Sequence, residues 1–266
     1  MFEEWKIIMD IEKMVNSKWY IFFDWVYKLI VMNLLTILIS VVSGIGFYLL
    51  FYYIQNGIFF LLGICVSFFT FIFCFVTNYR IIKLNDESKL SNIFKNYFIF
   101  FWENIKSIWL IALSFTIIFS ILLFSGYIYW LIVNTEGFVF DAIGWLYVIG
   151  FWAVLMIILS LFLGLLNLPA VVSYFRMKTW NYIKASFFIA FKYFFKSLFY
   201  LVLAAILPLL IIITINPALV SIWSIIGISG VQYIMYITSK GKFWYLTHNV
   251  EDFKTEDKIE MEEEND

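Results

Sequence analysis

Few residues of this chain have side chains that could do metal, redox or acid–base chemistry. The sequence contains one histidine, His248, and two cysteines, Cys65 and Cys74, which stand nine residues apart in an apolar run. One histidine cannot form a metal site alone, and the cysteines lack the C-x-x-C spacing of a metal or redox pair. We therefore expect both cysteines to be small buried residues and expect no metal or cofactor.

The charged residues nearest to the long apolar runs stand at the ends of those runs. Asp24 and Lys28 are spaced i, i+4 and can pair on one helix face. Arg80 and Arg176 close the matching strings VTNYR and VSYFR. We interpret six such residues as interfacial charge anchors, which hold the ends of helices at the lipid headgroups: Asp24, Lys28, Arg80, Lys106, Arg176 and Lys196.

No Asp, Glu, Lys, Arg or His stands near the middle of an apolar run. A proton relay needs a titratable group there, and a membrane hydrolase needs an acid–base pair or a metal cluster. A glycine-rich phosphate loop is also missing, which argues against ATP hydrolysis by this chain. We therefore expect a protein that is not an enzyme.

The composition is that of a membrane protein. Of 266 residues, 64% are hydrophobic and 14% are charged, whereas soluble domains average about 45–50% apolar and about 25% charged residues. A helix needs roughly 20 apolar residues to cross a bilayer. We predict an all-α bundle of six transmembrane helices, at 29–51, 57–79, 107–131, 142–168, 199–215 and 218–238.

Lysine and arginine predict the orientation of these spans. All 18 basic residues lie in the segments 1–28, 80–106, 174–198 and 239–266. An even number of spans separates these segments, so they share one side, and the positive-inside rule makes that side, with both termini, cytoplasmic. We expect 29–238 to be one transmembrane domain, 1–28 to be an amphipathic N-terminal segment and 239–266 to be a disordered acidic tail.

Three lysines stand at equivalent places before a pair of spans. Lys28, Lys106 and Lys196 close the strings FFDWVYK, FFWENIK and AFKYFFK. Polar stripes precede or include them at 3–13, 92–106 and 181–196, which is typical of amphipathic helices in the headgroup plane. We predict a threefold parallel repeat of interfacial helix, span and returning span. The alternative is convergence, because any helix that leaves the cytoplasm favours a cationic foot.

Small polar residues recur at helical spacing inside the predicted spans. Such faces allow close helix packing and hydrogen bonds between helices, or they line a route for a solute. We call the following eight residues the polar seam and keep both interpretations open: Asn33, Thr36, Ser40, Ser67, Thr70, Thr77, Asn167 and Gln232.

Several weak motifs occur here in the order typical of one family. They are DWVYKLIVMNLL, VVSGIG (41–46), the link that begins NYRIIKLNDESKL, and LPAVVSYF. Over about 20–240 the chain resembles the YesL family of bacterial integral membrane proteins, although Val-Ser-Gly stands where the family pattern has proline and Thr-Gly. The resemblance implies a bacterial plasma membrane and a link to carbohydrate uptake beside sugar-importing ABC transporters. It supplies no catalytic residues.

Three functions follow as hypotheses. The first is a non-enzymatic accessory or scaffold component of oligosaccharide uptake, which would bind an ABC transporter permease. The second is an autonomous transporter or channel for a small neutral or amphiphilic solute, with the polar seam as its route. The third is a lipid- or envelope-organising protein. The expected partners are the lipid bilayer, a permease or a second copy of the chain, and nothing indicates nucleic-acid binding.

Overall fold

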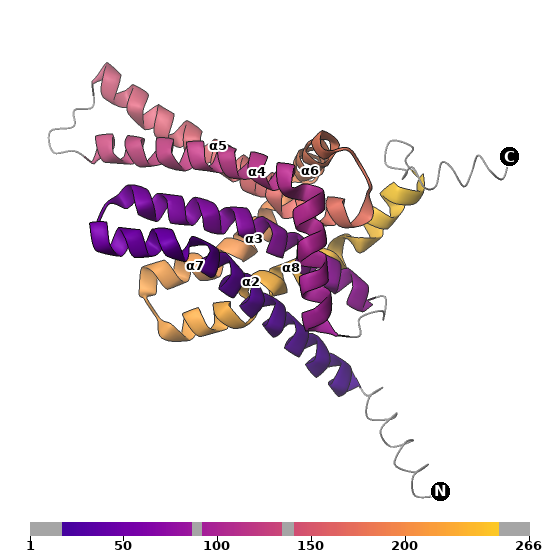
Figure 1. Ribbon diagram of the computed structural model, residues 1–266. Coiled ribbons are helices and arrows are strands. Elements are labelled where there is room, and N and C mark those ends of the chain that lie inside the picture. The colour runs from indigo at the N-terminus through magenta and orange to yellow at the C-terminus, as the bar shows by residue number, and fades with distance from the viewer. Residues whose placement is uncertain (1–17, 87–91, 135–140, 250–266) are drawn as a thin grey trace, which may run out of the picture.

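The chain folds into a helical bundle (Figure 1). The computed structural model describes residues 18–86, 92–134 and 141–249, and this part is helical and contains no strand. Six of its helices are long and apolar enough to cross a membrane, and α6 is the short exception. The predicted all-α, multi-pass membrane bundle is therefore confirmed. The helices are α2 (Lys18–Ile54), α3 (Gly57–Asp86), α4 (Ile93–Val133), α5 (Ala142–Tyr174), α6 (Thr179–Lys192), α7 (Phe194–Thr214) and α8 (Pro217–Asn249).

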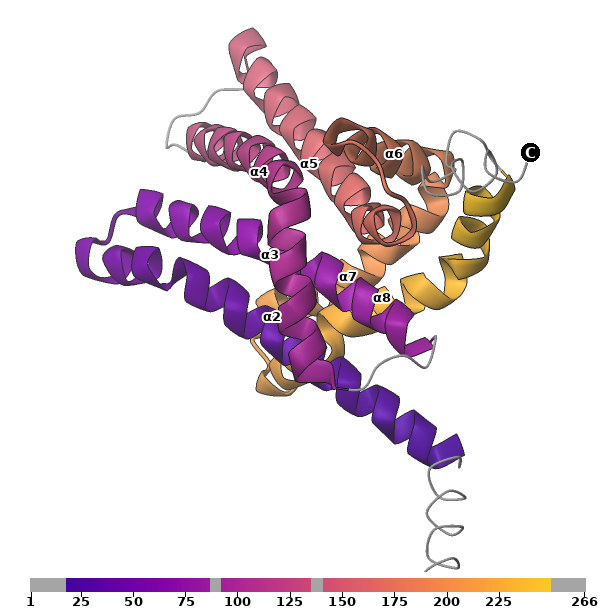
Figure 2. The same ribbon diagram turned by 45° about the vertical axis from the view of Figure 1, so that its right-hand side comes forward.

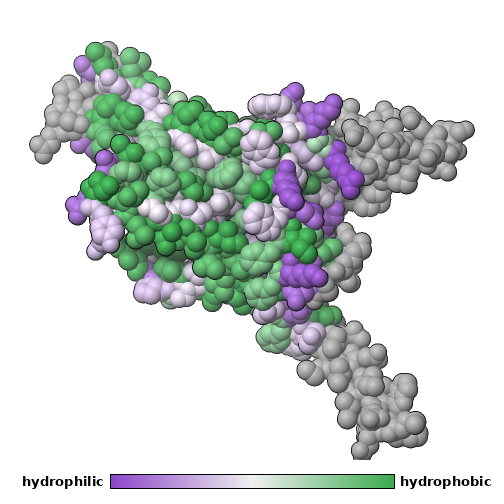
Figure 3. Space-filling model, viewed as in Figure 1, coloured by the Kyte–Doolittle hydropathy of each residue, from purple (hydrophilic) through white to green (hydrophobic). Residues whose placement is uncertain are grey.

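The six long helices form three hairpins whose tips point the same way. In Figure 1 the tips of α2–α3, α4–α5 and α7–α8 lie on the left, whereas α2 begins and α8 ends on the opposite side. Figure 3 shows a broad hydrophobic surface over the hairpins and a band of hydrophilic residues along the right-hand end. We call this right-hand side the cationic end. That it faces the cytoplasm remains a prediction.

Local sequence fixes the turns at the hairpin tips. Pro217 is the first residue of α8, where its missing N–H costs no helical bond, and the Asn216 side chain accepts a hydrogen bond from the Ala218 N–H at 2.9 Å. Asp141 caps α5 by accepting from the Gly144 N–H at 2.7 Å. The break predicted between the spans 199–215 and 218–238 is thus confirmed, although the residues around it are almost all apolar.

Helix α4 bends at Ile108, where φ is −122° and ψ is 15°. The residues before the bend, 93–107, run across the ends of the spans (Figures 1 and 2), and we call them the crossing segment. Helix α6 lies at the same end and is separated from α7 by Tyr193. The crossing segment matches the polar stripe predicted at 92–106. Helix α6 covers the stripe predicted at 181–196 only as far as Lys192, because Lys196 belongs to α7. The stripe at 3–13 lies outside the described residues.

Three helices extend past the predicted spans at the cationic end. Helix α2 begins at Lys18 and runs unbroken through Lys28, and α3 continues to Asp86. Helix α8 continues to Asn249, so the prediction of a disordered tail from 239 is wrong for 239–249, and 250–266 lies outside the described residues. Contacts between helices support these extensions, because Asp86 accepts hydrogen bonds from Tyr236 at 2.8 Å and from Lys240 at 3.0 Å.

A buried core lies toward the cationic end. It brings together Met32 of α2, Tyr79 of α3, Tyr97 of the crossing segment, Val171 of α5 and Tyr236 of α8, each at most 3% exposed. The outer helix faces carry exposed apolar side chains, for example Leu38, Ile121, Leu146 and Trp152. An apolar surface of this extent would cause aggregation in water, so its natural surroundings are the lipids of a bilayer.

Candidate functional site

Asn33 of the polar seam joins α2 to the backbone of α8. Its Oδ1 accepts from the N–H groups of Ile228 and Ser229 at 2.8 and 3.1 Å, and its Nδ2 donates to the carbonyls of Trp223 and Ser224, both at 2.8 Å. These four bonds use the full capacity of the fully buried amide. In an ordinary helix the Ile228 N–H would donate to the Ser224 carbonyl, four residues earlier. Here both groups bond to the Asn33 side chain, which therefore lies between two hydrogen-bonding partners of the α8 backbone.

Thr36 joins three helices at one hydroxyl group. It donates to the Met32 carbonyl at 2.8 Å and accepts from Asn78 Nδ2 of α3 at 2.9 Å. The Tyr97 hydroxyl of the crossing segment lies 3.2 Å from the same oxygen. All of these side chains are completely buried. Thr36 therefore holds α2, α3 and the crossing segment together.

Thr77 is the centre of a second network between α3 and the crossing segment. Its hydroxyl accepts from Asn104 Nδ2 at 2.9 Å, and Asn104 Oδ1 accepts from Arg80 at 2.8 Å. Arg80 also pairs with Glu103 at 2.8 Å and lies 4.4 Å from the centre of the Phe100 ring. Thr77 and Asn104 are fully buried, so a chain of bonds leads from the helix interior to the charged surface.

The remaining seam residues of α2 and α3 lie in the first hairpin. Ser67 shares a hydrogen bond with Tyr48 at 2.9 Å, and Thr70 shares one with Ser43 at 2.7 Å. The Ser40 hydroxyl is buried without a hydrogen-bond partner among the described residues. Ser67 and Thr70 thus make hydrogen bonds between α2 and α3, whereas Ser40 does not.

Asn167 and Gln232 bond to different neighbours. Asn167 Nδ2 donates to the Leu163 carbonyl of its own helix at 2.9 Å and to Ser197 of α7 at 3.1 Å. Gln232 Nε2 donates to the Phe75 carbonyl of α3 at 2.6 Å. Seven of the eight seam residues therefore bond to groups on neighbouring helices, in separate pairs and networks, and Ser40 is the exception. This arrangement favours the packing interpretation of the seam.

The charge anchors lie at the cationic end but have different surroundings. The predicted pair of Lys28 and Asp24 is present at 2.5 Å, and Lys28 also donates to Asn85 at 2.7 Å. Lys196 donates to the Thr238 carbonyl of α8 at 2.5 Å. Lys106 and Arg176 are exposed. The three lysines with equivalent places in the sequence therefore have no common contact.

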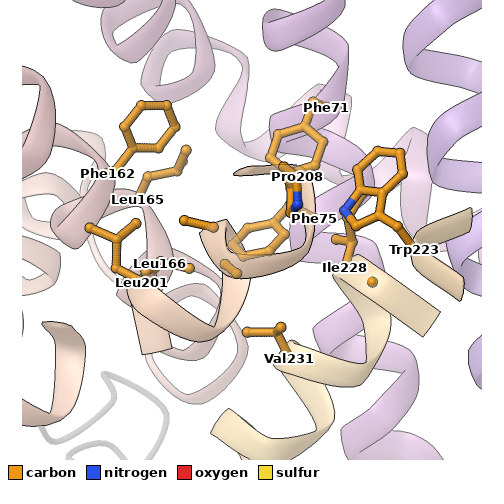
Figure 4. Close-up of a pocket in the computed structure, with 13 residues that line it drawn as sticks. Phe71, Phe75, Phe162, Leu165, Leu166, Leu201, Pro208, Trp223, Ile228 and Val231 are labelled. Carbon is orange, nitrogen blue, oxygen red and sulfur yellow. The ribbon is translucent and has the colours of Figure 1, made fainter. Parts of the chain in front are cut away.

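Two cavities are large enough to hold a ligand. The first, of about 340 Å³, is an apolar pocket between α3, α5, α7 and α8, and Figure 4 shows Phe71, Leu166, Pro208 and Trp223 around it. Its walls offer almost no hydrogen-bonding groups, so they suit a hydrocarbon chain better than a sugar. The second, of about 470 Å³, lies at the cationic end and is lined by both Arg80 and Arg176.

Sequence reasoning missed the partners of the seam. Asn78 and Asn104 are the buried amides that join the networks, yet Asn78 stood inside the string VTNYR and Asn104 beside a stripe assigned to the headgroups. Their signal was an amide next to an arginine or glutamate at the end of an apolar run. Hydropathy alone does not distinguish such an amide from a solvated one.

No constellation for metal chemistry is present in the described ranges. They contain no group of three or more His, Cys, Asp or Glu residues that could hold a metal ion. Cys65 and Cys74 are buried and not bridged to each other, and the side chain of His248 lies outside what the structure describes. The expectation of a non-enzymatic protein without metal or cofactor stays a prediction.

The fold and surface define a multi-pass α-helical membrane protein. No family model, no curated protein and no solved structure matches the chain. The resemblance to the YesL family therefore stays a prediction, as do the bacterial plasma membrane and the link to carbohydrate uptake.

Proposed function

We propose that this chain is a non-enzymatic scaffold or accessory component of a larger membrane assembly. The observation that carries the proposal is the use of the polar groups inside the spans. The Asn33 amide makes four bonds to the α8 backbone, and Thr36 and Thr77 bond to buried partners on neighbouring helices. Such groups stabilise a fixed bundle, because moving them apart would leave buried donors and acceptors unpaired.

The proposed partner is another polytopic membrane protein. The outer faces of α2, α4 and α5 present large apolar side chains, such as Leu38, Ile121 and Trp152, that lipid or a second helix bundle can cover. The resemblance to the YesL family narrows the proposal to an ABC transporter permease for oligosaccharides in a bacterial plasma membrane, with both termini of this chain in the cytoplasm.

The test is affinity purification of the tagged full-length chain from its native membrane in nanodiscs, followed by quantitative mass spectrometry. We expect a permease at a near-equal amount, and an unrelated tagged six-span protein from the same cells as control should not retain it. Recovery of the chain alone, or only with further copies of itself, would contradict the scaffold.

The polar seam also provides the test of the carrier hypothesis. Thr70 is partly exposed and bonds only to Ser43 and its own helix, so Thr70→Val should spare the fold. We expect proteoliposomes with the natural chain to show no flux of neutral sugars above empty vesicles. The carrier hypothesis would replace the scaffold hypothesis if the natural chain showed flux and Thr70→Val abolished it without lowering the thermal midpoint of the protein.

A further inference from the structure

The second cavity is a built pocket at the cationic end. Its volume is about 470 Å³, and it lies between the end of α3, the bend of α4 and the connection from α5 to α6. Hydrogen-bonding side chains alternate with apolar ones in its lining, and none of the lining residues that the structure describes has a carboxylate. The lining residues with polar side chains are Arg80, Asn104, Ser107, Ser173, Tyr174, Arg176 and Tyr182.

The two arginines come from equivalent places in the chain. Arg80 closes the string VTNYR near the end of α3, and Arg176 closes VSYFR just after α5. Because both helices run toward the cationic end, the same motif places two arginines in the lining of one pocket. Sequence analysis assigned them to separate interfacial contacts, whereas the structure gives them a common site.

Arg80 is held in a defined position. Its guanidinium group donates to Asn104 Oδ1 and to Glu103 Oε2, each at 2.8 Å, and lies over the Phe100 ring. A guanidinium group has five N–H donors, so these two bonds leave further donors for the pocket. Glu103 is the acidic partner of Arg80, at 2.8 Å.

Lys83 holds the part of the pocket wall that Ser173 and Tyr174 form, and it places a third cation near the pocket. Its amino group donates to the Ser173 carbonyl at 2.8 Å and lies 4.1 Å from the centre of the Tyr174 ring. Ser173 and Tyr174 both line the pocket. Tyr182 fixes the same connection, because its hydroxyl donates to the Phe175 carbonyl at 3.0 Å and accepts from the Met177 N–H at 3.1 Å.

We propose that this pocket binds a phosphate group through Arg80 and Arg176. Two planar guanidinium groups match the geometry of phosphate oxygens and form strong charge-assisted bonds with them. The pocket lies at the end of the spans where the charge anchors gather, which is the level of lipid headgroups. The phosphate can therefore belong to an anionic phospholipid or to a soluble phosphate ester. This site goes beyond the scaffold and does not depend on it.

The test is equilibrium binding to the full-length chain in detergent micelles, measured by calorimetry and by the shift of the thermal midpoint. The probes are dihexanoyl phosphatidic acid, glycerol 3-phosphate and inorganic phosphate, with dihexanoyl phosphatidylcholine as the zwitterionic control. We expect saturable binding of phosphatidic acid. If glycerol 3-phosphate binds equally well, the source of the phosphate is a soluble ester rather than a lipid.

Variants locate the site. Arg176→Gln is the deciding change, because Arg176 is exposed and its loss spares the buried bond between Arg80 and Asn104. We expect Arg176→Gln and Arg80→Gln each to weaken binding about tenfold, the effect of one charge-assisted hydrogen bond. The matched control Lys95→Gln with Lys184→Gln removes two exposed charges from the crossing segment and α6, and should change binding less than about twofold.

Two results would overturn the proposal. One is the absence of saturable binding by all three phosphate probes to the natural chain. The other is an equal loss of affinity in Arg176→Gln and in the double lysine variant, because attraction would then depend on the total charge of this end and not on the pocket.

Discussion

The crossing segment and α6 have the same amphipathic pattern and lie at the same end, yet they are attached by different means. The crossing segment is held by hydrogen bonds, through the completely buried side chains of Tyr97 and Asn104. Helix α6 is held mainly by close packing, and its buried residues are Ala185, Ser186, Ile189 and Ala190. Polar bonds fix one rotation of a helix, whereas small residues fix mainly its distance from a neighbour.

The two helices also join their spans differently. The crossing segment continues into its span through the bend at Ile108, whereas Tyr193 separates α6 from α7. The order of amphipathic helix, span and returning span thus occurs twice in the described residues. An amphipathic pattern alone predicts a helix at the membrane surface, but not how tightly that helix is tied to the bundle.

Among the changes that test the different attachment of the crossing segment and α6, Asn104→Leu should lower stability the most. The change removes the bonds to Thr77 and Arg80 and leaves both partners without the amide. We expect a loss of about 2 kcal/mol in the free energy of unfolding, measured in mixed micelles. Asn181→Leu, at an exposed position of α6, is the control and should cost less than about 0.5 kcal/mol. Equal losses in the two variants would mean that the bonds of the buried Asn104 amide add nothing to the stability of the bundle.

Gly164→Ala should loosen α6 by a smaller amount. A Cβ atom at Gly164 of α5 would lie 2.8 Å from the Phe187 ring of α6, and that ring is stacked on Phe115. Overpacking of this kind should cost about 1 kcal/mol, seen as a lower thermal midpoint. Gly126→Ala is the matched control, because its Cβ would meet only Val154 at 3.6 Å. A neutral Gly164→Ala would show that α6 is free to move outward.

Tyr182→Phe should have the smallest effect. It removes one hydroxyl that bonds to the Phe175 carbonyl and the Met177 N–H, in the connection before α6. Water can replace both bonds at this surface, so we expect a loss of about 0.5 kcal/mol. Hydrogen exchange at Met177 should become faster, whereas Tyr27→Phe, at an exposed position of α2, should leave it unchanged. Unchanged exchange in Tyr182→Phe would contradict a role in holding the connection.

The fold was largely predictable, because each span is a local property of the chain. The links predicted at 52–56 and 216–217 coincide with the breaks between α2 and α3 and between α7 and α8, and the stripe at 92–106 and most of the stripe at 181–196 correspond to amphipathic helices. The extensions of α2, α3 and α8 past the predicted spans were not predictable from hydropathy. They depend on contacts such as that of Asp86 with Tyr236, which join residues far apart in sequence.

The candidate site was predictable only in its residue types. The sequence marked Asn33, Thr36 and Thr77 as polar groups inside spans, but two interpretations fitted them equally. Their bonding partners lie on other helices, as the bonds of Asn33 to α8 and of Thr77 to Asn104 show, and these bonds favour the packing interpretation. The distance of Arg80 from Arg176 in sequence likewise gave no sign of a shared pocket.

The sequence by itself therefore determined that this protein is a six-span helical membrane protein with its basic residues gathered at one end. A bilayer selects apolar length and flanking charge one helix at a time, so both can be predicted without knowing the neighbours. Only the tertiary structure decided which groups the polar seam residues bond to and that two arginines line one cavity. Those outcomes depend on the rotation and packing of whole helices, which bring together groups that no local pattern relates.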